Sequence, residues 1–170
     1  MNIAHLLEQA GHLAGRQAVG RPRPIDLRRA VSAAYYAVFH TLTEAGAARL
    51  HTDATTRHLL SRTFDHRTMK DAARQFANKS GKLWLFAVAT FGSVPQELVR
   101  VAELFIKLQE ARHQADYDRR TASNFSRAVC QLRVTDARNL IRAWEAVRGT
   151  PQAQFFLLAL LLKDLGRFAD

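Results

Sequence analysis

The segment PQELVRVAELFIKLQEARHQADYDRR, residues 95–120, carries the pattern that decides the fold. Its apolar residues recur at helical spacing, and Pro95 suits the first turn of a helix that runs to about Arg120. On a helix that advances about 100° per residue, Arg112 falls at the centre of the apolar face. Because burying an unpaired guanidinium is costly, Arg112 needs a carboxylate, a water-lined cleft or a ligand. The apolar face consists of Leu98, Val101, Phe105 and Leu108.

Helical periodicity extends over most of the chain, and no strand pattern of convincing length competes with it. Residues 78–95 predict a loop or a short helix that packs onto the bundle. The sequence therefore predicts an all-α fold in one domain, residues 1–170, built as a bundle of four to five main helices plus a C-terminal apolar helix. The predicted helices extend from Ile3 to before residues 20–24, from about Asp26 to Arg49, from about Thr55 to Asn78 with a break near His66, from Pro95 to about Arg120, from about Ser123 to Arg148, and over residues 151–165.

The charge balance narrows the classes of partner. The formal net charge is +10, and 20 of the 25 basic residues are arginine, which favours anionic partners such as RNA or a nucleotide. The alternative is that the arginines are spread over solvated helix faces, because no long block of consecutive basic residues occurs.

The cysteine content and the apolar segments indicate the cellular compartment of the protein. Cys130 is the only cysteine, so an intramolecular disulfide is excluded. The N-terminus lacks the pattern of a signal peptide, and the longest apolar run, FFLLALLL at 155–162, is far shorter than the roughly 20 residues that a membrane-spanning helix needs. We expect a cytoplasmic protein without a membrane partner.

Three polar side chains gather near Arg112 on the helical surface. Asp116 lies one turn further along, and His113 and Tyr117 share the adjoining face. In one interpretation, Arg112 and Asp116 form an internal pair that locks this helix against its neighbours. In the other, Arg112 lines a cleft at a bundle seam or dimer axis and binds an anionic group such as a scissile phosphate, while a nearby histidine or tyrosine moves a proton.

The second predicted helix carries a polar and aromatic stripe that does not look like plain solvent covering. This stripe consists of Arg29, Tyr36 and His40, on the face opposite the core. Together with His58 and Arg119, these residues are candidates for nucleic-acid binding. The core face comprises Val31, Ala34, Tyr35, Val38 and Leu42.

Three blocks, LRRAVSAAYYAVFH (27–40), RHLLSRTF (57–64) and EARHQADYD (110–118), occur in an order that resembles the small prokaryotic members of the HEPN superfamily. In that subfamily the first block has an arginine followed by Ala-Tyr-Tyr-Ala and Phe-His, and the second begins with a histidine. The third reads Arg-x-x-Ala-Asp-Tyr, with one extra residue permitted. The resemblance is strongest over residues 25–120. The matching residues are Arg28 or Arg29, Ala34, Tyr35, Tyr36, Ala37, Phe39, His40, His58, Arg112, Ala115, Asp116 and Tyr117.

This resemblance implies a HEPN-like helical bundle, commonly dimeric, that acts in RNA metabolism. Many HEPN proteins are metal-independent endoribonucleases, often toxins of a toxin–antitoxin pair whose partner is a small nucleotidyltransferase. The resemblance therefore implies a homodimer, RNA or a nucleotide as ligand, and a small nucleotidyltransferase as partner.

The ribonuclease motif of that superfamily is an arginine, a polar residue, three more positions and then a histidine. Arg112 and His113 match its first two places, but Tyr117 stands where the histidine is expected. A phenol with an ordinary pKa of about 10 is a poorer general base at neutral pH than imidazole. Cleavage would therefore need His40, His58 or a residue of a second subunit to substitute. The candidate catalytic residues are Arg112, His113, Asp116 and Tyr117.

A different class of function is a non-catalytic dimeric helical interaction module, either a scaffold or an antitoxin-like partner. The run at 155–162 supports this class, because such a helix needs cover on all sides, unless that cover comes from the same chain. The two-sided apolar pattern of the last two predicted helices likewise favours a homodimer.

No metal or cofactor site is predicted. Glu110 and His113 have the ligand spacing of helical di-iron bundles, but the second pair that those sites need is missing. The sequence also lacks a glycine-rich phosphate loop.

Overall fold

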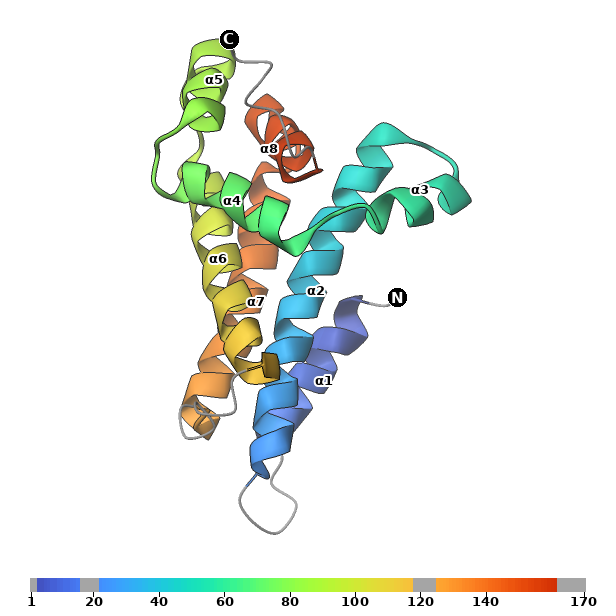
Figure 1. Ribbon diagram of the computed structural model, residues 1–170, viewed down its shortest axis with the longest axis vertical. Coiled ribbons are helices and arrows are strands. Elements are labelled where there is room, and N and C mark those ends of the chain that lie inside the picture. Colours follow the sequence, from blue (N-terminus) through green and yellow to red (C-terminus); the bar gives the residue numbers. More distant parts are fainter. Residues whose placement is uncertain (1–2, 16–21, 118–124, 162–170) are drawn as a thin grey trace.

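The computed structural model describes residues 3–15, 22–117 and 125–161, and these ranges contain eight α-helices and no strand (Figure 1). The prediction of an all-α fold is confirmed. The helices are α1 (Ile3–Gly15), α2 (Pro24–Leu50), α3 (Ala54–Ser61), α4 (His66–Ala77), α5 (Lys82–Phe91), α6 (Gln96–Tyr117), α7 (Arg127–Val147) and α8 (Pro151–Leu161).

Three helices lie between residues 54 and 91. The helical segment predicted over Thr55–Asn78 consists of α3 and α4, and the predicted break near His66 is confirmed; the segment 78–95, predicted as a loop or a short helix, contains the short helix α5. Aspartates cap both separate helices: the Asp53 carboxylate accepts a hydrogen bond from the Thr56 amide, and Asp65 accepts one from the Thr68 amide. An N-cap aspartate satisfies an amide that the first helical turn leaves unbonded, so each one starts a new helix.

The ends of the longer helices agree with their local sequence signals. Pro24 begins α2, and Arg23 before it has an extended backbone. The helix α7 begins after Ser126, whose hydroxyl accepts a hydrogen bond from the Val129 amide. The predicted end at Arg120, the predicted start at Ser123 and the predicted extension over 162–165 lie outside the described residues.

The long helices α2, α6 and α7 pack along one another and form the body of the bundle (Figure 1). The helix α1 lies against α2 and α7, and α4 crosses α6 and α8. Figure 1 shows α3 beside the C-terminal part of α2, outside this body. This arrangement places one face of α2 against one face of α6 and brings the start of α4 to both.

The link between α3 and α4 approaches α2 closely at Gly46. A Cβ atom at this position would lie 2.6 Å from Cζ of Phe64, which is buried. The missing side chain therefore lets the Phe64 ring lie against the α2 backbone.

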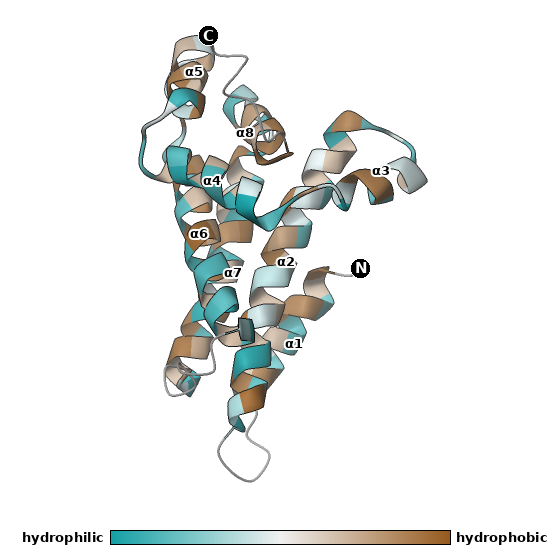
Figure 2. Cartoon of the chain, in the orientation of Figure 1, coloured by the Kyte–Doolittle hydropathy of each residue, from teal (hydrophilic) through white to brown (hydrophobic). Residues whose placement is uncertain are grey.

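The apolar helix α8 is covered within the chain. Phe156 is fully buried, and its ring packs edge-on against Phe76 of α4 with the ring centroids 4.9 Å apart. Further cover comes from α2 and α5. Figure 2 shows α8 as a mainly hydrophobic element at the end of the bundle where α4 and α5 lie. Apart from Leu158, the chain itself therefore covers most of the described part of the 155–162 run.

None of the helices in the described ranges is both long enough and apolar enough to cross a membrane.

Candidate functional site

The Arg112 side chain lies between α6 and α2, and 11% of it is exposed. Its Nε atom lies 2.7 Å from Oδ2 of Asp116, and its Nη2 atom donates to the Tyr36 hydroxyl at 2.8 Å. Nη2 also approaches the Tyr117 hydroxyl at 3.4 Å. The predicted proximity of Arg112 and Asp116 is confirmed. The guanidinium is therefore paired, and it is also anchored to a second helix.

Some of the hydrogen-bond donors of Arg112 remain unused. The approach of Nε to Asp116 lacks the direction of a hydrogen bond, so the buried Nε has no hydrogen-bond partner among the described residues. Over the same residues, hydrogen bonds from this side chain leave only from Nη2. A guanidinium has five N–H donors, so Arg112 is held in place with donors to spare.

Aromatic rings surround the guanidinium. Its Cζ atom lies 5.8 Å from the ring centroid of Tyr35, 5.4 Å from that of Tyr36 and 5.2 Å from that of Tyr117. These distances suit cation–π attraction, which favours the charged guanidinium. Tyr35 is fully buried, whereas 63% of Tyr117 is exposed. The aromatic surroundings of Arg112 therefore extend from the core to the surface.

Two further contacts fix the end of α6 to α2. The Ser32 hydroxyl donates to Oδ1 of Asp116 at 2.5 Å, and Nε of Arg28 donates to the Ala115 carbonyl at 2.5 Å. The predicted arginine of this face, Arg29, is exposed. Arg28, Ser32 and Tyr36 follow one another at i, i+4 spacing, which places them on one face of α2. That spacing is a sequence signal for this contact.

The imidazole that packs beside this cluster belongs to His66, the first residue of α4. Its Nδ1 atom lies 2.6 Å from the Tyr35 hydroxyl, and its ring centroid lies 4.4 Å from that of Phe39. Its backbone carbonyl accepts a hydrogen bond of 2.6 Å from the Gln109 amide of α6. The helical periodicity of the sequence assigns no site role to His66, because a residue at the start of a short helix belongs to no periodic stripe.

Charge and burial set the protonation states around Arg112. Burial alone lowers the pKa of Arg112, but Tyr36, Asp116 and Tyr117 together raise it above the ordinary value, so the guanidinium stays charged. Burial lowers the pKa of His66, and the positive charge of Arg112 lowers it further, against an opposing effect of Asp65. Neutral His66 therefore predominates at neutral pH.

The remaining predicted residues lie in different places. His113 is exposed, and its ring centroid lies 5.2 Å from that of Tyr117. His40 is half-buried and stacks on Tyr36, with the ring centroids 6.2 Å apart. His58 lies on α3, where it lines a groove of about 260 Å³ between α2 and α3. Arg119 lies outside the described residues. The structure thus gathers the predicted residues of α2 and α6, except Arg29, around Arg112 and places His58 in a separate groove.

The lowered histidine pKa values predict how stability depends on pH. Burial lowers the pKa of His40 as well as that of His66, although Glu44 opposes the shift at His40. Below the ordinary histidine value of about 6.5, the unfolded chain therefore binds more protons at these positions than the folded chain. We expect the free energy of unfolding to fall as the pH drops from about 7.5 through about 6.5 to the lowered values.

Urea unfolding at a series of pH values measures this effect. The variant in which His40 and His66 are both replaced by glutamine should lose much of the pH dependence over this interval. A wild-type protein that becomes more stable as the pH falls through this interval would contradict the burial described for these rings.

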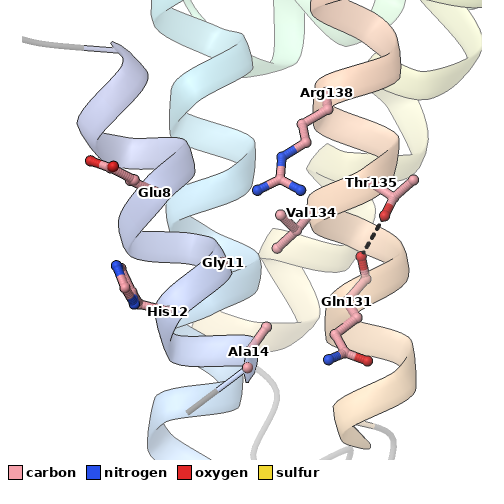
Figure 3. Close-up of a pocket in the computed structure, with 9 residues that line it drawn as sticks. Glu8, Gly11, His12, Ala14, Gln131, Val134, Thr135 and Arg138 are labelled. Atoms are coloured by element: carbon pink, nitrogen blue, oxygen red, sulfur yellow. Dashed lines mark hydrogen bonds between the residues drawn. The ribbon is translucent and has the colours of Figure 1, made fainter.

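A second cavity, of about 580 Å³, lies between α1 and α7. Figure 3 shows Arg138 reaching from α7 toward α1 beside Gly11, where a Cβ atom would lie 3.3 Å from its Nη2 atom. Arg138 is exposed, as expected for an arginine on a solvated helix face. Arg112 is the stronger candidate for a functional residue, because it is largely buried and held by several partners.

Over the described ranges, no group of three or more histidine, cysteine, aspartate or glutamate side chains could hold a metal ion. No protein-family model, curated protein or solved structure gives a significant match to this chain.

Proposed function

We propose that the protein binds RNA at the Arg112 site and acts in RNA metabolism as a HEPN-like protein. The observation that carries this proposal is the state of Arg112: charged, fixed between α6 and α2, and left with unused donors. A guanidinium fixed in this way can donate two hydrogen bonds to one phosphate group, at a smaller cost in side-chain entropy than a free arginine would incur. The net charge of +10 supports the proposal through long-range attraction.

The neighbours of Arg112 suit the rest of an RNA chain. Tyr117 is exposed beside the guanidinium, and the His113 ring packs against it. Exposed aromatic rings next to a phosphate-binding group are the features on which proteins stack the bases of single-stranded RNA. Single-stranded RNA is therefore the form that this surface fits best.

Metal-independent endoribonuclease activity is the catalytic form of this proposal. Arg112 would stabilise the charge that develops on the phosphate, as oxyanion-stabilising groups do. Asp116 and Ser32 hold the end of α6 in place. The resemblance to toxin members of the HEPN superfamily extends the proposal to a cytoplasmic homodimer with a small nucleotidyltransferase as its partner.

The alternative is a non-catalytic dimeric interaction module. The ion pair between Arg112 and Asp116 favours it, because a paired arginine needs no ligand. Its binding surface would include α5, where 65% of Leu85 and 38% of Val88 are exposed. A gene for a small nucleotidyltransferase next to this one would favour the toxin–antitoxin form over a scaffold.

Salt dependence distinguishes RNA binding from the alternative. We expect purified wild-type protein to bind single-stranded RNA at low salt, with an affinity that falls linearly on a logarithmic scale as salt is added, because neutralised phosphates release counterions. Fluorescence anisotropy with a labelled oligoribonucleotide measures this slope. Absence of binding at low salt would reject the proposal and leave the interaction module.

The catalytic form has its own test. Total RNA and purified tRNAs are incubated with wild type and with Arg112→Ala, in the presence of a chelator. An endoribonuclease is expected to cleave RNA as wild type but not as Arg112→Ala, without added metal. RNA that is bound but remains intact would restrict the protein to RNA binding.

A further inference from the structure

The hydrogen bond between Tyr35 and His66 determines which nitrogen of the imidazole carries its proton. Tyr35 is fully buried, and its hydroxyl lies 2.6 Å from Nδ1 of His66. Burial raises the pKa of Tyr35, so its hydroxyl keeps its hydrogen. A buried hydroxyl hydrogen without an acceptor costs free energy, and Nδ1 is the acceptor within reach. In the neutral ring Nδ1 therefore accepts, and the proton lies on Nε2.

The surroundings oppose a second proton on this ring. Protonated Nδ1 could no longer accept from Tyr35, which would leave the buried hydroxyl without an acceptor. Arg112 from α6 and His40 from α2 also disfavour a positive charge, and only Asp65 beside α4 favours one. Neutral His66 with its proton on Nε2 is the state that satisfies the buried groups.

The protonated nitrogen lies on the side of the ring away from Nδ1. The two ring nitrogens of an imidazole point in diverging directions, so Nε2 points away from the Tyr35 hydroxyl. Within the described ranges it has no hydrogen-bond partner, and the side chain is only half-buried. The His66 ring also packs edge-on against Tyr36, which binds Arg112. An uncharged donor thus belongs to the same aromatic cluster, Tyr35 and Tyr36, against which the guanidinium packs.

We propose that His66 is a second phosphate-binding residue of the Arg112 site, which donates its Nε2–H to an RNA phosphate oxygen while Tyr35 fixes its tautomer. This inference rests on the proposed RNA-binding function and adds a residue from α4 to it. His66 then acts as a neutral hydrogen-bond donor. It does not replace the histidine base of the ribonuclease motif, in whose place this chain has Tyr117. Tyr35 is a positioning residue, because it acts only through His66.

The tautomer is tested without RNA. Long-range proton–nitrogen NMR spectra of ¹⁵N-histidine-labelled protein distinguish the two neutral tautomers from the charged ring. At about pH 7.5 we expect the Nε2-protonated tautomer of His66 to dominate. In Tyr35→Phe, the loss of the donor should give a mixture of tautomers and a higher His66 pKa. A charged ring, or a proton mainly on Nδ1 in wild type, would overturn the proposal.

The binding role is tested with a single-stranded oligouridine of about ten nucleotides. His66→Ala should weaken binding by about tenfold, because one hydrogen bond to a charged group is lost. The amide nitrogen of glutamine reaches about the place of Nε2, so His66→Gln should remain within about threefold of wild type. Tyr35→Phe should lie between them. Exposed His5, replaced by glutamine, is the control, and the melting temperature of each variant shows that it is folded.

The possible failures have different signatures. If Arg112→Ala weakens binding but His66→Ala and His66→Gln both bind like wild type, His66 is not a binding residue and the RNA function stands. If alanine and glutamine weaken binding equally, the donor role of Nε2 is wrong. If wild type binds no RNA at low salt, the proposed function falls together with this role.

Discussion

Replacing Arg112 by alanine is expected to weaken RNA binding by about ten- to a hundredfold and to lower the free energy of unfolding by about 1–3 kcal/mol. The binding loss follows from the removal of a charged donor that can make two hydrogen bonds to one phosphate. The stability loss follows because Asp116 loses its cationic partner and the Tyr36 hydroxyl loses its donor. Fluorescence anisotropy and urea unfolding measure the two effects.

Arg138→Ala is the matched control. It also removes one positive charge, but from an exposed arginine of α7 in the separate cavity beside α1. We expect it to change stability by less than about 0.5 kcal/mol. Equal losses of RNA affinity in Arg112→Ala and Arg138→Ala would show that binding depends on net charge and not on the site.

Replacing Phe156 by alanine is expected to lower the free energy of unfolding by about 3–5 kcal/mol, because it empties a fully buried aromatic position. The lost contacts join α8 to α4 through Phe76. Urea unfolding measures the loss, and Leu158→Ala on the exposed side of α8 is the control, with an expected loss below about 1 kcal/mol. A loss for Phe156→Ala as small as that of the control would contradict the docking of α8 onto the bundle.

The sequence was most informative where a contact lies within one helix. Arg112 and Asp116 are four residues apart on α6, so their proximity follows from helical geometry alone. The same geometry put Tyr36 and His40 on one stripe of α2, and both lie near Arg112 in the structure. Periodicity could not predict which helix contacts that stripe, because this depends on how α2 packs against α6.

His66 shows the limit of the same reasoning. Its place beside Tyr35 and Phe39 depends on α4 crossing the bundle, a tertiary arrangement that no spacing within α4 encodes. The separation of α3 from α4 does have a signal in the sequence. Asp53 and Asp65 each lie three residues before the threonine whose amide they cap. The predicted break near His66 is confirmed, because α3 ends at Ser61 and α4 begins at His66.

The two-sided apolar patterns that favoured a homodimer have an explanation within the chain. The helix α7 packs against α6 on one side and against α1 and α2 on others, and α8 packs against α2, α4 and α5. These contacts bury most of both patterns without a second subunit, and leave Leu132 and Leu158 exposed. The homodimer therefore depends on the family resemblance, and light scattering over a range of concentrations tests it.

The most direct test of the Arg112 site is to compare Arg112→Lys with wild type in RNA binding and in thermal unfolding. Lysine keeps the positive charge but loses the planar pair of donors that fits a phosphate. If Arg112 binds RNA, its affinity for single-stranded RNA at low salt falls by about tenfold, while the melting temperature changes by less than about 3 °C. A clear drop in melting temperature with RNA affinity unchanged would contradict this account, because Arg112 would then serve only to hold α6 against α2.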